Sequence, residues 1–173
     1  MKTLARLLTL AVVSISTLAL AESAGSNSSF ATMKALAGEW EGSIITNPPE
    51  PSVQGKVAHV TLRVTSMGNA LLHEMNIPGR PDDPITMFYQ EDGRLILTHY
   101  CDAGNRPRME GKPSSAGKGV EFSLLNVSGS MEEGHMHGAA FSVIEPDHHT
   151  EDWTFMVPGK GPVQAHFDLR RKK

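Results

Sequence analysis

The sequence predicts an all-β protein: a single antiparallel up-and-down β-barrel of about ten strands, preceded by one short helix. Three observations support this fold class. Between residues 39 and 171, apolar and polar residues alternate in about ten segments, the pattern of strands that have two different faces. Turn sequences rich in Gly, Pro, Asn and Asp separate the segments, and such short links favour antiparallel neighbours. No segment between them is long enough for the helix of a β-α-β crossover.

A barrel is preferred to the alternative, a β-sandwich. Closing the sheet removes exposed strand edges, and a barrel of about this size can hold one small ligand. An immunoglobulin-like sandwich would carry two core cysteines and a tryptophan at a set spacing, whereas Cys101 is the only cysteine of this chain. A closed barrel is therefore the predicted architecture.

The first 21 residues are predicted to be a signal peptide. Lys2 and Arg6 give a positive n-region, and Leu7–Leu20 is an apolar run. Ala19-Leu20-Ala21 fits the small-x-small rule, which places cleavage after Ala21. The run is too short to serve as a membrane anchor. We therefore expect a periplasmic or secreted protein with no stable membrane anchor after cleavage.

Cleavage would leave a flexible leader over residues 22–29 and one domain over residues 30–173. Because the removed segment contains Lys2 and Arg6, the formal net charge would change from −3 to about −5. An acidic domain of this kind argues against nucleic acid or an anionic membrane as partner. A single cysteine forms no internal disulfide, and burial is the expected state of Cys101.

The domain is predicted to begin with a short amphipathic helix, because Phe30, Met33 and Leu36 recur at helical spacing before Gly38. Ten strands follow, each bounded by residues that favour turns. The expected strands are Glu39–Thr46, Lys56–Ser66, Ala70–Asn76, Ile85–Gln90, Arg94–Cys101, Arg106–Gly111, Gly119–Asn126, His137–Glu145, Glu151–Val157 and Val163–Arg171. The intervening turns are Gly68-Asn69, Pro78-Gly79, Asp92-Gly93, Pro113–Gly117, Ser128–Ser130, Glu145–Asp147 and Pro158–Gly161.

Two motifs resemble those of known β-barrel families. The segment Leu36–Gly42, LAGEWEG, is similar to the Gly-x-Trp opening of the first strand in lipocalins and fatty-acid-binding proteins, the calycins. That resemblance implies that Trp40 packs against an arginine of the last strand, here Arg170, and such a contact contributes about 0.5–2 kcal/mol. His99–Cys101 followed by Asn105–Met109 resembles an uncharacterised family of exported bacterial lipocalin-like domains, which implies a fold but no ligand or reaction.

The segment Leu95–Met109, LILTHYCDAGNRPRM, is the most informative for function, because an apolar strand ends in a cluster of unlike polar side chains. Alternation places His99 and Cys101 on one face and Tyr100 on the other. If the first face points into the barrel, the imidazole and the thiol line a pocket. The alternative is a hydrogen-bonded histidine beside an inert cysteine. We predict that His99 and Cys101 line a pocket, with Tyr100 near its mouth.

The polar residues after this strand are less decisive. Asn105 is expected to cap the turn and, with Arg106, to lie near the mouth of the barrel. Arg106 and Arg108 share one face of a short strand. Facing inward, they would select a carboxylate or phosphate, and facing outward they would be ordinary solvated charges. The sequence leaves both orientations open.

Several strands carry stripes in which His, Met and Trp accompany aliphatic residues. Such stripes are first of all core, because burying one large apolar side chain is worth about 1.5–3 kcal/mol. Their mixed chemistry is also typical of the wall of a small-molecule cavity. The predicted ligand-binding residues, wall and mouth together, are His73, Met87, His99, Tyr100, Cys101, Asn105, Arg106, Phe141 and Trp153. We therefore predict an exported barrel that binds a small, mostly apolar molecule, with no cofactor and no metal.

Haem or metal binding is an alternative. Some ten-stranded barrels related to calycins hold haem through one histidine, and His99, His135 or His137 could serve as the ligand. His135 and His137 lie two residues apart, so on a strand they point the same way, as zinc or copper requires. No third metal-binding residue lies at a spacing typical of a metal site, so solvent-facing histidines are favoured. His148 and His149 fall on a predicted turn and are likewise expected to face solvent.

An enzyme is the third alternative, a hydrolase or isomerase that uses His99 with Tyr100 or Glu74. The sequence reproduces no known catalytic spacing, and it identifies no third group to orient a histidine–cysteine pair. We therefore predict no catalytic residues.

Overall fold

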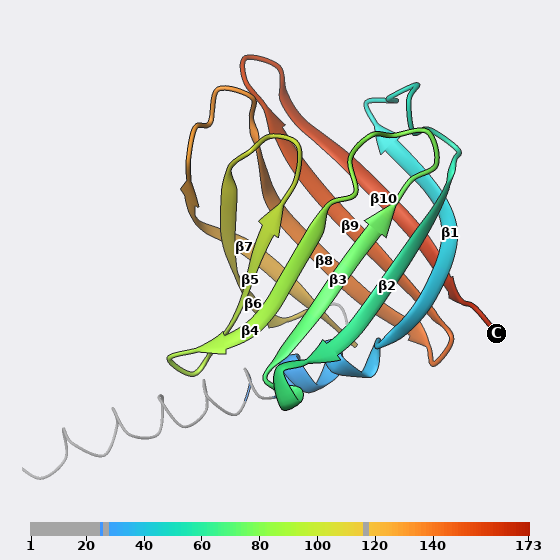
Figure 1. Cartoon of the computed structure of the whole chain (residues 1–173), viewed down its shortest axis with the longest axis vertical. Coiled ribbons are helices and arrows are strands. Elements are labelled where there is room, and N and C mark those ends of the chain that lie inside the picture. Colours follow the sequence, from blue (N-terminus) through green and yellow to red (C-terminus); the bar gives the residue numbers. More distant parts are fainter. Residues whose placement is uncertain (1–24, 26–27, 116–117) are drawn as a thin grey trace, which may run out of the picture.

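The computed structural model describes residue 25, residues 28–115 and residues 118–173. Ten antiparallel strands form a closed barrel in which each strand pairs with the next along the chain and the last pairs with the first (Figure 1). The prediction of an up-and-down barrel is confirmed. The predicted signal peptide, residues 1–21, lies outside the described residues. No helix of the described part is long and apolar enough to cross a membrane.

The observed strands follow the predicted segments, and most differ from them by a few residues at one or both ends. A 3-10 turn, η1 (Ser66–Gly68), joins β2 to β3. The strands are β1 (Gly38–Asn47), β2 (Val57–Thr65), β3 (Ala70–Asn76), β4 (Ile85–Glu91), β5 (Arg94–Tyr100), β6 (Arg106–Pro113), β7 (Gly119–Ser128), β8 (His135–Glu145), β9 (His148–Val157) and β10 (Gly161–Arg171).

A short helix lies at one end of the barrel, which we call the closed end (Figure 1). The helix spans residues 28–35, so it begins inside the expected leader. Its predicted apolar face is buried, because Phe30, Met33 and Leu36 are each at most 4% exposed. The Trp40 indole N–H donates to the Leu36 carbonyl oxygen at 2.8 Å. This bond ties the end of the helix to the start of β1.

An arginine of β10 covers Trp40 at the closed end. The guanidinium carbon of Arg171 lies 4.1 Å from the centroid of the Trp40 ring. Arg171 Nη1 also donates to the Ala37 carbonyl oxygen at 2.8 Å. The expectation that Arg170 would hold this position is wrong by one residue. The strand register pairs Trp40 with Arg171, and alternation turns Arg170 to the outer face.

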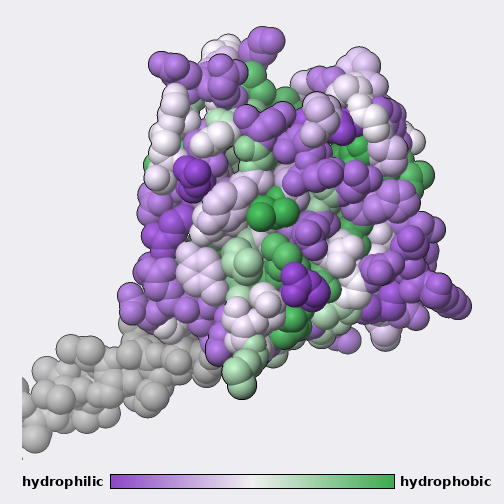
Figure 2. Space-filling view, in the orientation of Figure 1, coloured by the Kyte–Doolittle hydropathy of each residue, from purple (hydrophilic) through white to green (hydrophobic). Residues whose placement is uncertain are grey.

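Bulky apolar side chains fill the closed half of the barrel. Phe88, Phe122 and Phe141 meet edge to face, with ring centroids 5.4 to 6.0 Å apart. The outer surface is mainly hydrophilic, with a small hydrophobic group in the middle of the face shown in Figure 2. The large apolar side chains exposed on that surface, on all sides, include Ile45, Val57, Val64, Ile85, Tyr100 and Ile144.

The other end of the barrel, which we call the open end, is formed by the loops that join β1 to β2, β3 to β4, β5 to β6, β7 to β8 and β9 to β10. The two longest of these loops cover residues 48–56 and 77–84. The helix therefore covers one end of the barrel, and the longest loops surround the other.

Candidate functional site

The orientation of β5 decides most of the site. The side chains of His99 and Cys101 point into the barrel, whereas Tyr100 is 39% exposed on the outer face. The prediction for His99 and Cys101 follows the alternation of the strand. Tyr100 does not reach the mouth of the cavity, and it contacts Arg106 across the outer surface, with the guanidinium 6.0 Å from its ring centroid.

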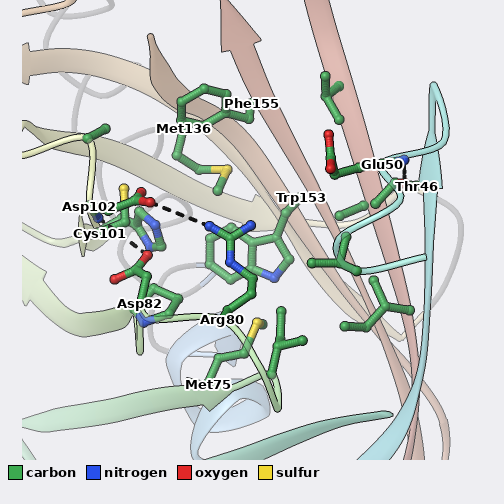
Figure 3. Close-up of a pocket in the computed structure, with 18 of the residues that line it drawn as sticks. Thr46, Glu50, Met75, Arg80, Asp82, Cys101, Asp102, Met136, Trp153 and Phe155 are labelled. Atoms are coloured by element: carbon green, nitrogen blue, oxygen red, sulfur yellow. Dashed lines mark hydrogen bonds and ion pairs between the residues drawn. The ribbon is translucent and has the colours of Figure 1, made fainter. Parts of the chain in front are cut away.

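A cavity of about 560 Å³ occupies the open half of the barrel. Its size lies within the range of sites that take one small molecule. Figure 3 shows side chains from several strands directed into it. The wall is mostly apolar and includes Ile44, Val53, Met75, Met136, Phe155 and Phe167.

A buried carboxylate, Glu151, lies at the inner end of this cavity. Its Oε2 accepts hydrogen bonds from His73 Nε2 and Trp153 Nε1, both at 3.0 Å. Its Oε1 is 3.1 Å from His149 Nε2. Glu151 and His149 are wholly buried, and His73 is 2% exposed. His73 and Trp153 also line the cavity, so this network forms part of its floor.

The network keeps Glu151 ionised. Burial by itself would raise the pKa of this carboxyl, but the charge of His73 and the hydrogen bonds from His149 and His73 outweigh burial. They hold the pKa of Glu151 well below its usual range. A buried charge with several donors is fixed in place, because any movement would break those bonds without water to replace them.

His99 is the second polar group of the floor. Its Nδ1 is hydrogen-bonded to Thr86 Oγ1 at 2.8 Å, and its ring lies 5.4 Å from that of Trp153. Burial, with a smaller contribution from His73, lowers the pKa of His99 to about 3, so the imidazole is neutral at neutral pH. Its other nitrogen, Nε2, is buried and has no hydrogen-bond partner. Such a nitrogen can bond a polar atom of a ligand.

Charged side chains surround the mouth of the cavity. Arg80 Nη2 lies 3.4 Å from Asp102 Oδ2, and the Asp102 backbone N–H donates to Asp82 Oδ2 at 3.3 Å (Figure 3). Burial raises the pKa of Asp82, against the effect of that backbone hydrogen bond. Glu50 and Glu133 also line the cavity. The interior is therefore apolar, and the rim is polar and mainly acidic.

Of the nine predicted ligand-binding residues, the structure brings four to the cavity wall: His73, His99, Cys101 and Trp153. Phe141 is buried one layer deeper, with its ring centroid 5.7 Å from that of Trp153 and 6.1 Å from that of His73. It supports the floor without lining the cavity. Burial raises the pKa of the Cys101 thiol, so Cys101 offers no thiolate at neutral pH.

Four predicted residues lie elsewhere. Met87 is on the outer face of β4, because Thr86 and Phe88 take the inward positions. Arg106 and Arg108 also face outward, which settles their open orientation, and Arg108 pairs with Glu91 on the surface. Asn105 is buried and structural: its amide N–H groups donate to the carbonyl oxygens of Ser130 and Gly134. Tyr100, described above, is the fourth.

The prediction that His135 and His137 face solvent agrees with their position. His135 and His137 lie outside the cavity, with Nε2 and Nδ1 3.2 Å apart, while Met136 between them points inward. A register shift between Met136 and Gly138 separates His137 from the inward stripe of β8. Within the described residues, no third His, Cys, Asp or Glu completes a metal site with them.

The expectation for His148 and His149 is wrong. Both belong to β9, which begins directly after a two-residue turn, and His149 is wholly buried. The inward stripe of β9 therefore runs His149, Glu151, Trp153. Sequence reasoning missed Glu151, although it lies two residues before Trp153 on the same face. Extending the Trp153–Phe155 stripe backwards by four residues would have found both missed residues.

The enzyme alternative gains no support from the geometry. Tyr100 and Glu74 both face outward, whereas His99 faces inward, so neither is placed to act with it.

No protein-family model matches the sequence, and no curated protein matches it. Solved structures with the same fold do match. Rv2717c from M. tuberculosis is 12% identical, with a TM-score of 0.60 over 84% of this chain and 98% of that one. A protein of unknown function from Nostoc punctiforme, of the DUF3598 family, is 12% identical, with a TM-score of 0.55 over 81% of this chain. This chain spans about half, 49%, of the Nostoc protein. At such identities the similarity shows the barrel fold alone.

Proposed function

We propose that this protein binds one small, mostly apolar molecule in the open half of its barrel. The observation that carries the proposal is the cavity of about 560 Å³, whose wall is apolar and whose floor holds a few fixed polar groups. Small-molecule sites in proteins combine these two features, because apolar contact supplies affinity and a few polar atoms fix orientation.

Different side chains supply the apolar contact and the polar contact. Met136, Phe155 and Trp153 offer adaptable and aromatic surface to an apolar body. His99 offers one hydrogen bond at the inner end when its ring turns its unpartnered Nε2 toward the cavity. We also propose, from the N-terminal sequence and the lipocalin-like motifs, that binding takes place in the periplasm or outside the cell.

Tryptophan fluorescence provides the test, because the two tryptophans of the chain lie in different places. Trp153 lines the cavity, and Trp40 lies under Arg171 at the closed end. The Trp40→Phe variant therefore leaves one reporter in the site, and Trp153→Phe is its matched control. Fatty acids, retinoids, flavins and haem form the ligand panel. We expect at least one of them to change the fluorescence of the Trp40→Phe variant with sub-millimolar affinity and to raise the melting temperature.

A panel in which no compound shifts either signal would contradict the proposal. A fluorescence change that persists in Trp153→Phe but not in Trp40→Phe would also contradict it, because the bound molecule would then lie away from the cavity.

Haem bound through His99 is a second candidate, favoured by one observation. Thr86 holds Nδ1 of this histidine and leaves Nε2 without a partner, and a histidine that binds a metal is oriented in this way by its other nitrogen. The imidazole would have to turn toward the cavity, because Nε2 is buried. Titration with hemin tests the idea: a Soret band that shifts for the wild type and not for His99→Leu would support it, and identical spectra would exclude it.

A further inference from the structure

We infer that the cavity selects amphiphilic cations: molecules with an apolar body and a positively charged group at the end that faces the mouth. This inference rests on the proposed function and adds the charge of the ligand to it. It follows from the charges that line the mouth, from the shape of the cavity and from the polar atom at its inner end.

The mouth carries more negative than positive charge. Among the residues that line the cavity, four are carboxylates, and Arg80 is the one cation apart from His73, which is paired with the buried Glu151. The carboxylates are Glu50, Asp82, Asp102 and Glu133. They come from four different loops or loop ends, so they surround the opening and do not form a patch on one side.

The single cation does not cancel this excess. Arg80 pairs with Asp102, and Asp82 accepts the Asp102 backbone N–H on the same side of the mouth. One cation therefore faces two carboxylates on that side. Arg80 also attracts Glu50, but its single charge leaves an excess of three negative charges among the four carboxylates of the lining. Beyond the lining, the Lys56 ammonium donates to the Pro78 carbonyl oxygen, and Asp83 accepts from Asn76, so these nearby charges offset one another.

The cavity also has a direction. Its inner end is closed by Trp153, His73 and His99, and its middle is apolar. The His99 side chain, only 4% exposed, gives one polar contact at the inner end when its ring turns the unpartnered Nε2 toward the cavity. A molecule whose charge lay at that end would have to lose its water there, which is unfavourable. The His99 imidazole is neutral, and the buried Glu151 carboxylate is already hydrogen-bonded to His73, His149 and Trp153. The charged group of a ligand therefore belongs at the mouth.

Coulomb interaction sets the size of the effect. One contact between unit charges at about 4 Å changes affinity about fivefold even at the dielectric constant of bulk water. With three carboxylates in excess, we expect a cation to bind at least about tenfold more tightly than an anion of the same apolar body at low salt. Because the rim is exposed to solvent, added salt should reduce this ratio.

Three surfactants with the same decyl chain test the inference below their micellar concentrations: decyltrimethylammonium, decyl maltoside and decyl sulfate. Binding is followed through Trp153 in the Trp40→Phe protein and by calorimetry with the wild type. The expected order of affinity is ammonium, then maltoside, then sulfate. Equal affinities, or a preference for the sulfate, would overturn the inference and leave the proposed function standing. No binding of any of the three, together with a negative ligand panel, would overturn the proposed function itself.

Charge-neutral variants of the rim sharpen the test. Arg80→Gln should increase the ammonium-to-sulfate ratio by about twofold to fivefold, and Glu50→Gln with Glu133→Gln should reduce it by a similar factor or more. Glu74→Gln is the matched control, because Glu74 is exposed on the outer face of β3, and it should leave the ratio unchanged. The affinity ratio could stay unchanged in the rim variants, or Glu74→Gln could change it by the same factor. Either result would show that the net charge of the protein, and not the charges at the mouth, determines the preference for cations.

Discussion

The closed and open ends of the barrel are made by the same ten strands but filled in different ways. At the closed end, the helix, Trp40 and Arg171 cover a layer of tightly packed aromatic side chains. At the open end, the inward positions hold smaller or half-exposed residues such as Thr46, Val163 and Ala165, and a cavity remains. The strand geometry is shared, so the size of the inward side chains decides where a barrel of this kind is solid and where it is hollow.

The polar network around Glu151 lies between these two halves. It is buried beneath the cavity and flanked by aromatic side chains, because the strand registers pair Glu151 with Phe141 on one side and Phe167 on the other. Trp40 meets His149 edge to face at 4.2 Å, so the network is also in contact with the closed end. The floor of the site therefore belongs structurally to the core, and changes there should affect stability before they affect binding.

Removal of the Glu151 carboxylate should have the largest effect. Glu151→Ala leaves His73, His149 and the Trp153 indole N–H without their buried acceptor, and breaking a buried pair of this kind costs about 3–5 kcal/mol. Urea denaturation measures the free energy of unfolding. Glu74→Ala, on the outer face of β3, is the control and should change it by less than about 0.5 kcal/mol. Similar values for the two variants would show that the network is not structural.

Two phenylalanines allow a direct comparison of the two halves. Phe141 is 1% exposed among other rings, so Phe141→Ala should destabilise the protein by about 3–5 kcal/mol. Phe155 lines the cavity and already lacks packing partners on one side, so Phe155→Ala should cost only about 1 kcal/mol. Thermal and urea unfolding check both values. Equal losses would mean that the open half is packed as firmly as the closed half.

The fold could be predicted from the sequence because alternation and turn chemistry are local signals. The ten strands, the helix face of Phe30, Met33 and Leu36, and the shared face of His99 and Cys101 all follow from such signals. Alternation does not say which face of that strand points inward. An error arose where register matters: a pairing offset of one residue exchanged Arg170 for Arg171. The shift in β8, which keeps His137 on the surface, is a feature of the same kind. Neither the offset nor the shift can be recognised without knowing the partner strand.

The site was harder to predict than the fold, because its residues meet across the barrel. His73 on β3 and Glu151 on β9 are 78 positions apart, and no local pattern links them. The rim was missed for a related reason: Arg80, Asp82 and Glu133 lie in loops whose charges look like ordinary solvated groups in the sequence. Only closure of the sheet brings these loops to one opening.

The pH dependence of stability should distinguish the two polar groups of the floor. The pKa of His99 falls from an ordinary 6.5 to about 3 in the folded protein, so between these values the unfolded chain binds a proton that the folded protein does not. Stability therefore falls as the pH drops below 6.5. The pKa of Glu151 is also lowered, but from 4.5, so its contribution is retained until the pH falls below that value.

Between about pH 7.5 and about pH 5, His99 alone should thus lower the free energy of unfolding by about 2 kcal/mol. Urea denaturation at both pH values, for the wild type and for His99→Gln, isolates this contribution from those of the other histidines. The variant should lose about 2 kcal/mol less than the wild type over the same interval. Parallel losses in the two proteins would mean that the buried imidazole takes up its proton without unfolding.

The smallest effect should come from the closed end. Arg171→Met removes the cation over Trp40 and the hydrogen bond to the Ala37 carbonyl oxygen, while it keeps an apolar side chain in place. We expect a loss of about 1–2 kcal/mol in the free energy of unfolding, with no change in ligand affinity at the opposite end. Arg170→Met is the matched control, because Arg170 is exposed on the outer face of the same strand, and it should have almost no effect. If both variants unfold alike, the arginine does not close the barrel; if Arg171→Met also weakens ligand binding, the two halves are coupled through Trp40 and His149 and are not independent.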